Sequence, residues 1–172
     1  MSFNKIQLPA PIIAGLFKNK LVLVDTDFVS KATQADTKAG KPLFLGDNKK
    51  NILIIVNDNE AVHIREEWLS LLTNMLAACK LNMGDVAIVN RYNQNHSFDM
   101  LKTQLSPAYA ILFGITTQDI LLPFAIPHYQ VQHYNQSVFL TAPAFQMLAG
   151  NGEAARIEKS KLWLSLKKMF NI

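Results

Sequence analysis

Runs of apolar residues separated by polar breaks divide the last two-thirds of the chain into alternating strands and helices. The run ILIIV at 52–56 has no polar alternation and stops abruptly at Asn57, which is typical of a strand covered on both faces. Apolar residues then recur at helical spacing from Ile64 to Cys79, and this spacing predicts one amphipathic helix. The polar residues 57–59 before it have the chemistry of a turn and a helix cap.

The rest of the chain continues this alternation. A β-strand followed by a helix and another strand is the usual sequence pattern of a parallel sheet with helices on both faces. The order of elements therefore predicts an α/β fold, a three-layer α/β/α sandwich with a mainly parallel central sheet. Further strands are predicted at 85–90, 108–114, 129–134 and 137–141, a turn at Asn135 and Gln136, helices at about 97–105 and 153–170, and a helical turn at 115–122.

The first fifty residues do not follow this alternation. Residues 8–13 contain two prolines, residues 18–25 favour an edge strand, and residues 30–41 are small and polar, as in a loop. We therefore divide the chain into an N-terminal arm and edge segment at 1–50 and an α/β domain at 51–172.

Composition supports one globular domain. The chain has 172 residues, 49% of them hydrophobic and 17% charged, which is enough to bury a sizeable core and argues against disorder. No apolar run is long enough to span a bilayer, and the first residues lack the layout of a signal peptide, so we expect a cytoplasmic protein with no membrane partner. The one cysteine, Cys79, excludes an intrachain disulfide and a cysteine-based zinc or iron–sulfur site, and its helical stripe predicts a buried structural thiol.

Charge is distributed unevenly along the chain, whose formal net charge is +4. Residues 1–50 carry eight Lys and four Asp, residues 51–152 carry four basic and seven acidic residues, and residues 153–172 carry five basic and two acidic residues. The two ends are therefore basic and the middle is acidic. This asymmetry fits nucleic acid or an acidic protein as a partner, and a solvated Lys-rich surface is the alternative.

The predicted last helix is the best candidate for a nucleic-acid contact. Basic residues beside an aromatic ring can contact phosphates and stack a base. In the alternative, the helix lies on the surface with Trp163 packed inward. The candidate contacts around Trp163 are Lys159, Lys161, Lys167 and Lys168.

The ends of the predicted strands are where chemistry is expected, because ligands of open α/β sheets bind at the carboxyl edge. The stretch FLTAPAFQML at 139–148 offers one hydroxyl there, on Thr141, and nothing that titrates near neutral pH. Asp58 and Glu60 could form a general acid–base pair if buried, or a solvated cap at a helix N-terminus. The candidate cleft at this edge comprises Asn57, Asp58, Asn90, Thr141 and Pro143.

Metal and cofactor chemistry is not indicated. The histidines His63 and His96 are far apart in sequence, and a five-residue offset puts His128 and His133 on opposite faces of a strand. Gly114 alone does not make a phosphate loop, and no nucleophile motif occurs. We therefore predict no metal site and no cofactor.

The order of these segments resembles the uracil-DNA-glycosylase-like superfamily. VNDNE at 56–60 sits where the glycosylases carry their water-activating motif, and the strand that ends in Asn90 is similar to one of theirs. LTAPAFQMLAGN at 140–151, followed by the basic helix, is similar to their final motif. The resemblance covers about residues 51–170, and it implies their fold.

The catalytic parts of that final motif are mostly missing. Its proline is retained as Pro143, but the histidine position falls on Ala142 and the serine position on Ala144. In the superfamily the histidine donates to the uracil oxygen as charge builds on the leaving base, and Ala142 has no donor. The cysteines of the iron–sulfur branches are also absent.

The first motif has changed as well, because Asn59, Glu60 and Ala61 replace the glycine and proline that let the backbone approach the base. Asn90 is retained. Its amide could read a flipped base, or it could cap the junction between strand and loop.

Within the superfamily, the chain resembles the psi-subunit family of bacterial DNA polymerase III, itself similar to a glycosylase that has lost its chemistry. The resemblance lies in the strand end at 56–58, in TAPAF, in KLWLSLKKM and in the N-terminal arm at 6–20. It implies a non-catalytic accessory protein of DNA replication or repair, with the DNA polymerase III clamp loader or other replication proteins as partners and DNA as a further candidate. The residues implied in docking are Leu8, Ile12, Ile13, Leu16 and Phe17.

Two other functions stay open. A divergent uracil-type DNA glycosylase would use Asp58 to position water and Asn90 to read the base, and an uncharacterised small-molecule binder could use the same fold. An enzyme needs an open pocket at Asn90, whereas an accessory protein tolerates one filled by side chains such as Tyr92 or Phe145.

Overall fold

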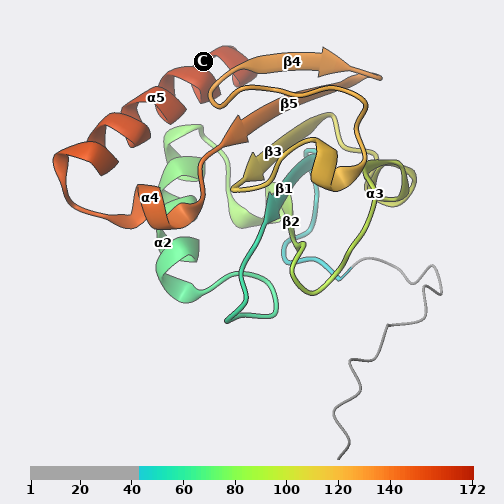
Figure 1. The fold of residues 1–172 in the computed structure, drawn as a ribbon, viewed down its shortest axis with the longest axis horizontal. Coiled ribbons are helices and arrows are strands. Elements are labelled where there is room, and N and C mark those ends of the chain that lie inside the picture. The colour runs from blue at the N-terminus through green and yellow to red at the C-terminus, as the bar shows by residue number, and fades with distance from the viewer. Residues whose placement is uncertain (1–42) are drawn as a thin grey trace, which may run out of the picture. The chain divides into compact units, whose positions relative to one another are not determined.

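Five strands form one sheet in the computed structural model, which describes residues 43–172. Their spatial order is β2-β1-β3-β5-β4, and only β4 runs antiparallel to its neighbour. The α/β class and the mainly parallel sheet are confirmed (Figure 1). The strands are β1 (Ile52–Val56), β2 (Val86–Asn90), β3 (Tyr109–Phe113), β4 (Val131–Tyr134) and β5 (Ser137–Ala142).

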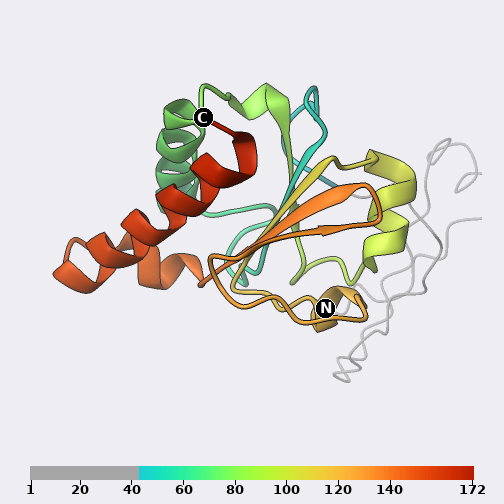
Figure 2. The ribbon, with the colours of Figure 1, turned by 90° about the horizontal axis from the view of Figure 1, so that it is seen from above.

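Helices cover both faces of this sheet, an arrangement compatible with a three-layer sandwich (Figure 2). The helices α2, α4 and α5 pack on one face, and α3 with the turn η2 packs on the other. Their bounds are α2 (Glu66–Ala78), η1 (Met83–Asp85), α3 (Phe98–Leu105), η2 (Gln118–Ile120), α4 (Phe145–Ala149) and α5 (Glu153–Phe170).

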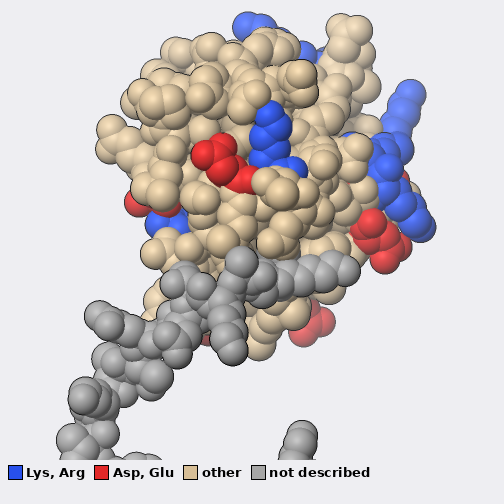
Figure 3. All heavy atoms as spheres, turned by 90° about the vertical axis from the view of Figure 1, so that its right-hand side faces the viewer, with Lys and Arg blue, Asp and Glu red and all other residues tan. Residues whose placement is uncertain are grey.

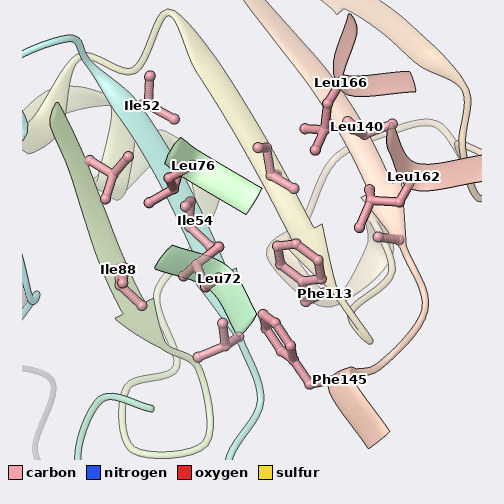
Figure 4. Packing of buried hydrophobic residues seen from close by; sticks show 14 of the residues in the cluster. Ile52, Ile54, Leu72, Leu76, Ile88, Phe113, Leu140, Phe145, Leu162 and Leu166 are labelled. Atoms are coloured by element: carbon pink, nitrogen blue, oxygen red, sulfur yellow. The ribbon is translucent and has the colours of Figure 1, made fainter. Parts of the chain in front are cut away.

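Alternate residues of each buried strand pack into two separate hydrophobic cores, because successive side chains of a strand point to opposite faces of the sheet. Ile52 and Ile54 of β1 face α2, whereas Leu53 and Ile55 face α3. Figure 4 shows the first core, in which Leu72 of α2 lies over the sheet between β1 and β2. Every residue of β1 and β2 is buried, as the unbroken apolar runs predict.

Most predicted elements are confirmed within two residues at each end. The hairpin turn between β4 and β5 is also confirmed, with positive φ angles of 49° at Asn135 and 68° at Gln136. Cys79 is buried and free, as expected.

The cap predicted at residues 57–59 was wrong. The first long helix begins at Glu66, and its N-cap is Arg65, whose side chain makes no capping hydrogen bond. The intervening segment is a loop, because buried polar contacts of Asp58 hold it in place, as described below.

The two edges of the sheet differ. The segment at 43–50, which the sequence analysis assigned to the N-terminal region, lies along β2: Leu45 forms a bridge with Ile88, and the N–H of Asn48 donates to the carbonyl of Val86 at 3.1 Å. The other edge is β4, most of which is exposed. These described residues belong to one unit, Ala39–Ile172.

No helix within residues 43–172 is long and apolar enough to cross a membrane. The docking residues expected in the arm, Leu8, Ile12, Ile13, Leu16 and Phe17, lie outside the described residues, as does the strand expected at 18–25.

Candidate functional site

Asp58 lies at the carboxyl edge of the sheet, two residues after β1. Its side chain is fully buried. One carboxylate oxygen accepts from the N–H of Glu60 at 3.0 Å and from Nη2 of Arg65 at 2.8 Å. The other accepts from the backbone N–H of Arg65 at 2.8 Å and from its Nε at 3.3 Å. The carboxylate therefore ties the start of the loop to the start of α2, and it is not the solvated cap that was one of its two predicted roles.

These contacts decide the charge of Asp58. Burial by itself would raise the pKa of the carboxyl, but hydrogen bonds from the Arg65 side chain and from two backbone N–H groups outweigh it and lower the pKa. Asp58 is therefore ionised at neutral pH. A carboxylate held in this state is a weak base, and its lone pairs are already occupied by N–H donors.

Asn90 ends the neighbouring strand β2 and is also fully buried. Its Oδ1 accepts from the N–H of Asp58 at 3.0 Å, and its Nδ2 donates to the carbonyls of Asp58 and Ala61, each at 2.8 Å. The N–H of Tyr92 adds a second donor to Oδ1 at 3.2 Å. The amide therefore caps the strand–loop junction, which was one of its two expected roles.

Aromatic side chains fill the region next to this pair. Phe145 stacks on Phe113 with centroids 4.3 Å apart and on Trp68 at 5.5 Å. The guanidinium of Arg65 lies 3.9 Å from the centroid of Trp68. Figure 4 shows the rings of Phe113 and Phe145 facing each other at the end of β3. Of the two side chains expected to fill the cleft, Phe145 is buried, and Tyr92 is 62% exposed.

The residues that follow β3 and β5 are in close contact. Gly114 follows β3 with a φ of +65°, and its N–H donates to the carbonyl of Ala142 at 3.0 Å. A Cβ added at Gly114 would lie 2.8 Å from the Cβ of Ala144, closer than real Cβ contacts come. Pro143, between these two residues of the turn, is buried. The turn after β5 therefore packs so closely against Gly114 that no side chain fits there.

Thr141 faces a different part of the molecule from Asp58 and Asn90. Its hydroxyl donates to the carbonyls of Ile126 and Pro127, at 3.1 and 2.9 Å. It lines a hollow of about 160 Å³, together with Ile115, Thr116, Thr117, Gln118, Ala125, Ile126 and His128. The structure thus brings Asp58 and Asn90 together, with Asn57 exposed beside them, and places Thr141 elsewhere.

The four lysines proposed as nucleic-acid contacts all lie on α5. Lys167 lies over the ring of Trp163, with Nζ 5.8 Å from the centroid, and Lys159 donates to the carbonyl of Gly150. Lys161 instead pairs with Glu158 at 2.8 Å. Lys159 and Lys167 therefore flank Trp163 at four-residue spacing, whereas Lys161 and Lys168 point to another side of the helix.

Trp163 itself is half-buried and packs against the core, and Leu162, Leu166 and Met169 are buried. On the face drawn in Figure 3, described Lys and Arg side chains are scattered among uncharged atoms, and they form no single patch there.

Within residues 43–172, no group of three His, Cys, Asp or Glu side chains lies close enough to hold a metal ion. Burial lowers the pKa of His96, whose Nε2 lies 3.0 Å from the amide oxygen of Gln94. His128 is exposed and lines the hollow beside Thr141.

Arg65 is the residue of this region that the sequence patterns did not single out. It binds Asp58, pairs with Glu60 at 2.8 Å and covers Trp68. One signal was available: an arginine three residues before a tryptophan, at the start of a helix, places both on the same side.

No family model matches the chain, and no curated protein matches it.

Proposed function

We propose that this chain is a non-catalytic accessory protein of DNA replication or repair. In this proposal it has the uracil-DNA-glycosylase-like fold and is related to the psi-subunit family of bacterial DNA polymerase III. One observation carries the non-catalytic part. Asp58 and Asn90, the two residues that a glycosylase would use, are fully buried, and the amide of Asn90 is hydrogen-bonded to the backbone N–H and carbonyl of Asp58.

These bonds leave neither residue free for the chemistry. A general base must reach the proton of a water molecule, and a group that reads a base must offer open donors and acceptors. The carboxylate of Asp58 already accepts four N–H groups, and the amide of Asn90 is bonded through both Oδ1 and Nδ2. Ala142, at the position of the catalytic histidine, is buried and offers no donor.

The role in DNA metabolism rests on the order of the sequence motifs. An accessory protein acts through its partners, so the apolar residues of the arm at 6–20 would dock the clamp loader or another replication protein. DNA would be contacted by the cations of α5, of which Lys161, Lys167 and Lys168 are exposed.

The first test combines catalysis and binding in the same tubes. The purified full chain is incubated with single- and double-stranded DNA that contains one uracil, abasic sites are measured, and binding is followed by anisotropy at two salt concentrations. We expect no abasic product. Product that vanishes in Asp58→Ala and Asn90→Ala, but persists in the control Asn93→Ala, would establish a glycosylase instead.

The second test addresses the partner. A reconstituted bacterial clamp loader is mixed with the full chain and with the double variant Leu16→Ala, Phe17→Ala, and complex formation is measured by size-exclusion chromatography. We expect a complex with the natural chain and a loss of that complex in the variant. If the clamp loader forms no complex with the natural chain, the proposed partner is contradicted.

A further inference from the structure

A groove between α2 and α5 lies on the outer side of the helical layer, away from the strand ends. Figure 2 shows the two helices side by side. Leu71, Met75 and Ala78 of α2 form one wall, and Trp163 and Leu166 of α5 form the other. The hollow between them measures about 190 Å³. Pockets for small molecules usually measure about 300 to 1,000 Å³, so this hollow fits a side chain better than a whole ligand.

One wall of the groove is uncharged and the other is cationic. Residues three or four apart share one face of a helix, so Arg156, Lys159, Trp163 and Lys167 form one stripe along α5. Lys159 lines the hollow, and Lys167 lies over the ring of Trp163. The α2 wall contains apolar side chains and Asn74, and no acidic residue.

The positive charges of this stripe are not paired with a carboxylate in the part of the chain that the structure describes, and the ammonium of Lys159 donates to a backbone carbonyl, that of Gly150. Within residues 43–172, Arg156, Lys159 and Lys167 form no ion pair, whereas Lys161, on another side of α5, is paired with Glu158. Unpaired cations beside an apolar hollow are complementary to a surface that combines apolar side chains with carboxylates.

We propose that the α2–α5 groove binds an amphipathic protein segment whose apolar side chains enter the hollow and whose Asp or Glu side chains lie along the cationic stripe. A helical segment meets this requirement, because a helix presents apolar anchors at three- or four-residue spacing and fits between two helices. A nucleic acid fits less well, because the walls of the hollow are mostly apolar and a phosphate chain has no apolar anchor. This proposal goes beyond the proposed function: it assigns Lys159 and Lys167 to a protein segment instead of DNA, and it does not depend on a role in DNA metabolism.

The test uses a display library of random peptides of about 16 residues, roughly four helical turns. The library is selected on the immobilised full chain and counter-selected on Ala78→Trp. Ala78 is exposed at the edge of the groove, so a tryptophan there would fill the hollow without entering the core. We expect enriched peptides with apolar residues at helical spacing and an excess of Asp and Glu. Enrichment of basic peptides, or of none that prefers the natural chain, would overturn the proposal.

Two charge reversals on α5 then separate the groove from the general charge of the helix. The enriched peptide is labelled, and its affinity is measured by anisotropy for Lys167→Glu, which lies on the stripe, and for the matched control Lys168→Glu. We expect about tenfold weaker binding with Lys167→Glu and little change with Lys168→Glu. Equal losses of peptide affinity in both variants would overturn the proposal that the acidic side chains lie along the cationic stripe.

Two other occupants are distinguished in the same experiment. Oligothymidine that displaces the peptide, and whose own binding is unaffected by Ala78→Trp, would overturn the proposal in favour of a nucleic-acid surface. A concentration-dependent dimer that is lost in Ala78→Trp, measured by sedimentation, would overturn it in favour of a second copy of the chain.

Discussion

At the scale of single residues, the buried carboxylate of Asp58 connects three segments: β1, the loop after it and α2. Its pKa is lowered in the folded protein, so folding favours the ionised form. The stability that this carboxylate contributes is therefore present above the unfolded pKa of about 4 and is lost as the pH falls through the folded value.

Replacement of Asp58 by asparagine tests this contribution. We expect Asp58→Asn to lower the free energy of unfolding at pH 7 by about 2 kcal/mol, because the amide keeps only one acceptor oxygen, its Nδ2 would face N–H donors, and the remaining hydrogen bonds lose their charge. Between pH 6 and pH 3, urea denaturation should show a smaller fall in stability for the variant than for the natural protein. The fall should not vanish, because the pKa values of Asp119 and Glu158 are also lowered.

The control at this scale is Glu60→Gln, which removes the other partner of Arg65. The side chain of Glu60 is 65% exposed, and exposed ion pairs contribute little to stability. We expect almost no change in stability. If Glu60→Gln lowered the free energy of unfolding as much as Asp58→Asn, the buried pair of Arg65 with Asp58 would not be the main contribution of Arg65 to stability.

The sequence could suggest Asp58 and Asn90 as neighbours, but it could not tell what they do together. Asp58 follows one predicted parallel strand and Asn90 ends the next, and such strands end at the same edge of a sheet, so their proximity was expected. Their hydrogen bonds join residues 32 positions apart, and no local pattern encodes such a bond. The same limit applies to the ring of Phe145, whose place between Trp68 and Phe113 depends on three elements.

At the scale of elements, the joined exits of β3 and β5 can be tested at Gly114. We expect Gly114→Ala to destabilise the protein by about 1–3 kcal/mol, because the backbone is left-handed and the new Cβ would collide with Ala144. Thermal denaturation measures the change. The control is Gly150→Ala, where the added Cβ meets only an ordinary contact at 3.4 Å and φ is −65°. Equal effects of the two substitutions would contradict the close approach.

The hairpin turn between β4 and β5 offers a stabilising change. Gln136 has a φ of 68°, a conformation that costs a side chain with a Cβ about 1 kcal/mol. Gln136→Gly should therefore raise the melting temperature, because an Asn-Gly pair suits this turn. Asn135→Gly should raise it less, since asparagine already tolerates positive φ. A larger rise in melting temperature from Asn135→Gly than from Gln136→Gly would show that Gln136 is not the main site of backbone strain in this turn.

Elements differed in how well the sequence predicted them. The unbroken runs of β1 and β2 and the periodicity of α5 identified those elements almost to the residue, because burial on both faces or on one helical stripe leaves a regular pattern. The start of α2 was misplaced, because Asn57 to Asn59 have the composition of a cap but their backbone is held by long-range bonds instead.

At the scale of the whole molecule, stability should decrease from the centre of the sheet to β4. β1 is paired on both sides and β4 on one, and only β4 is mostly exposed. We expect the amide hydrogens of β1 and β3 to exchange last and those of β4 to exchange much earlier, as measured by hydrogen–deuterium exchange with mass spectrometry. Equal protection of β4 and β1 would mean that a further segment covers that edge.

The unequal edges of the sheet also limit how this protein can assemble. The backbone at 43–50 already occupies positions along β2, through Leu45 and Asn48, so an incoming strand meets paired groups there. Within residues 43–172, β4 remains as the edge to which a strand could be added. A sheet with one open edge can form a dimer by strand addition, but it cannot extend into an assembly of many copies. For the sheet formed by residues 43–172, growth by strand addition at β4 would therefore stop at two molecules.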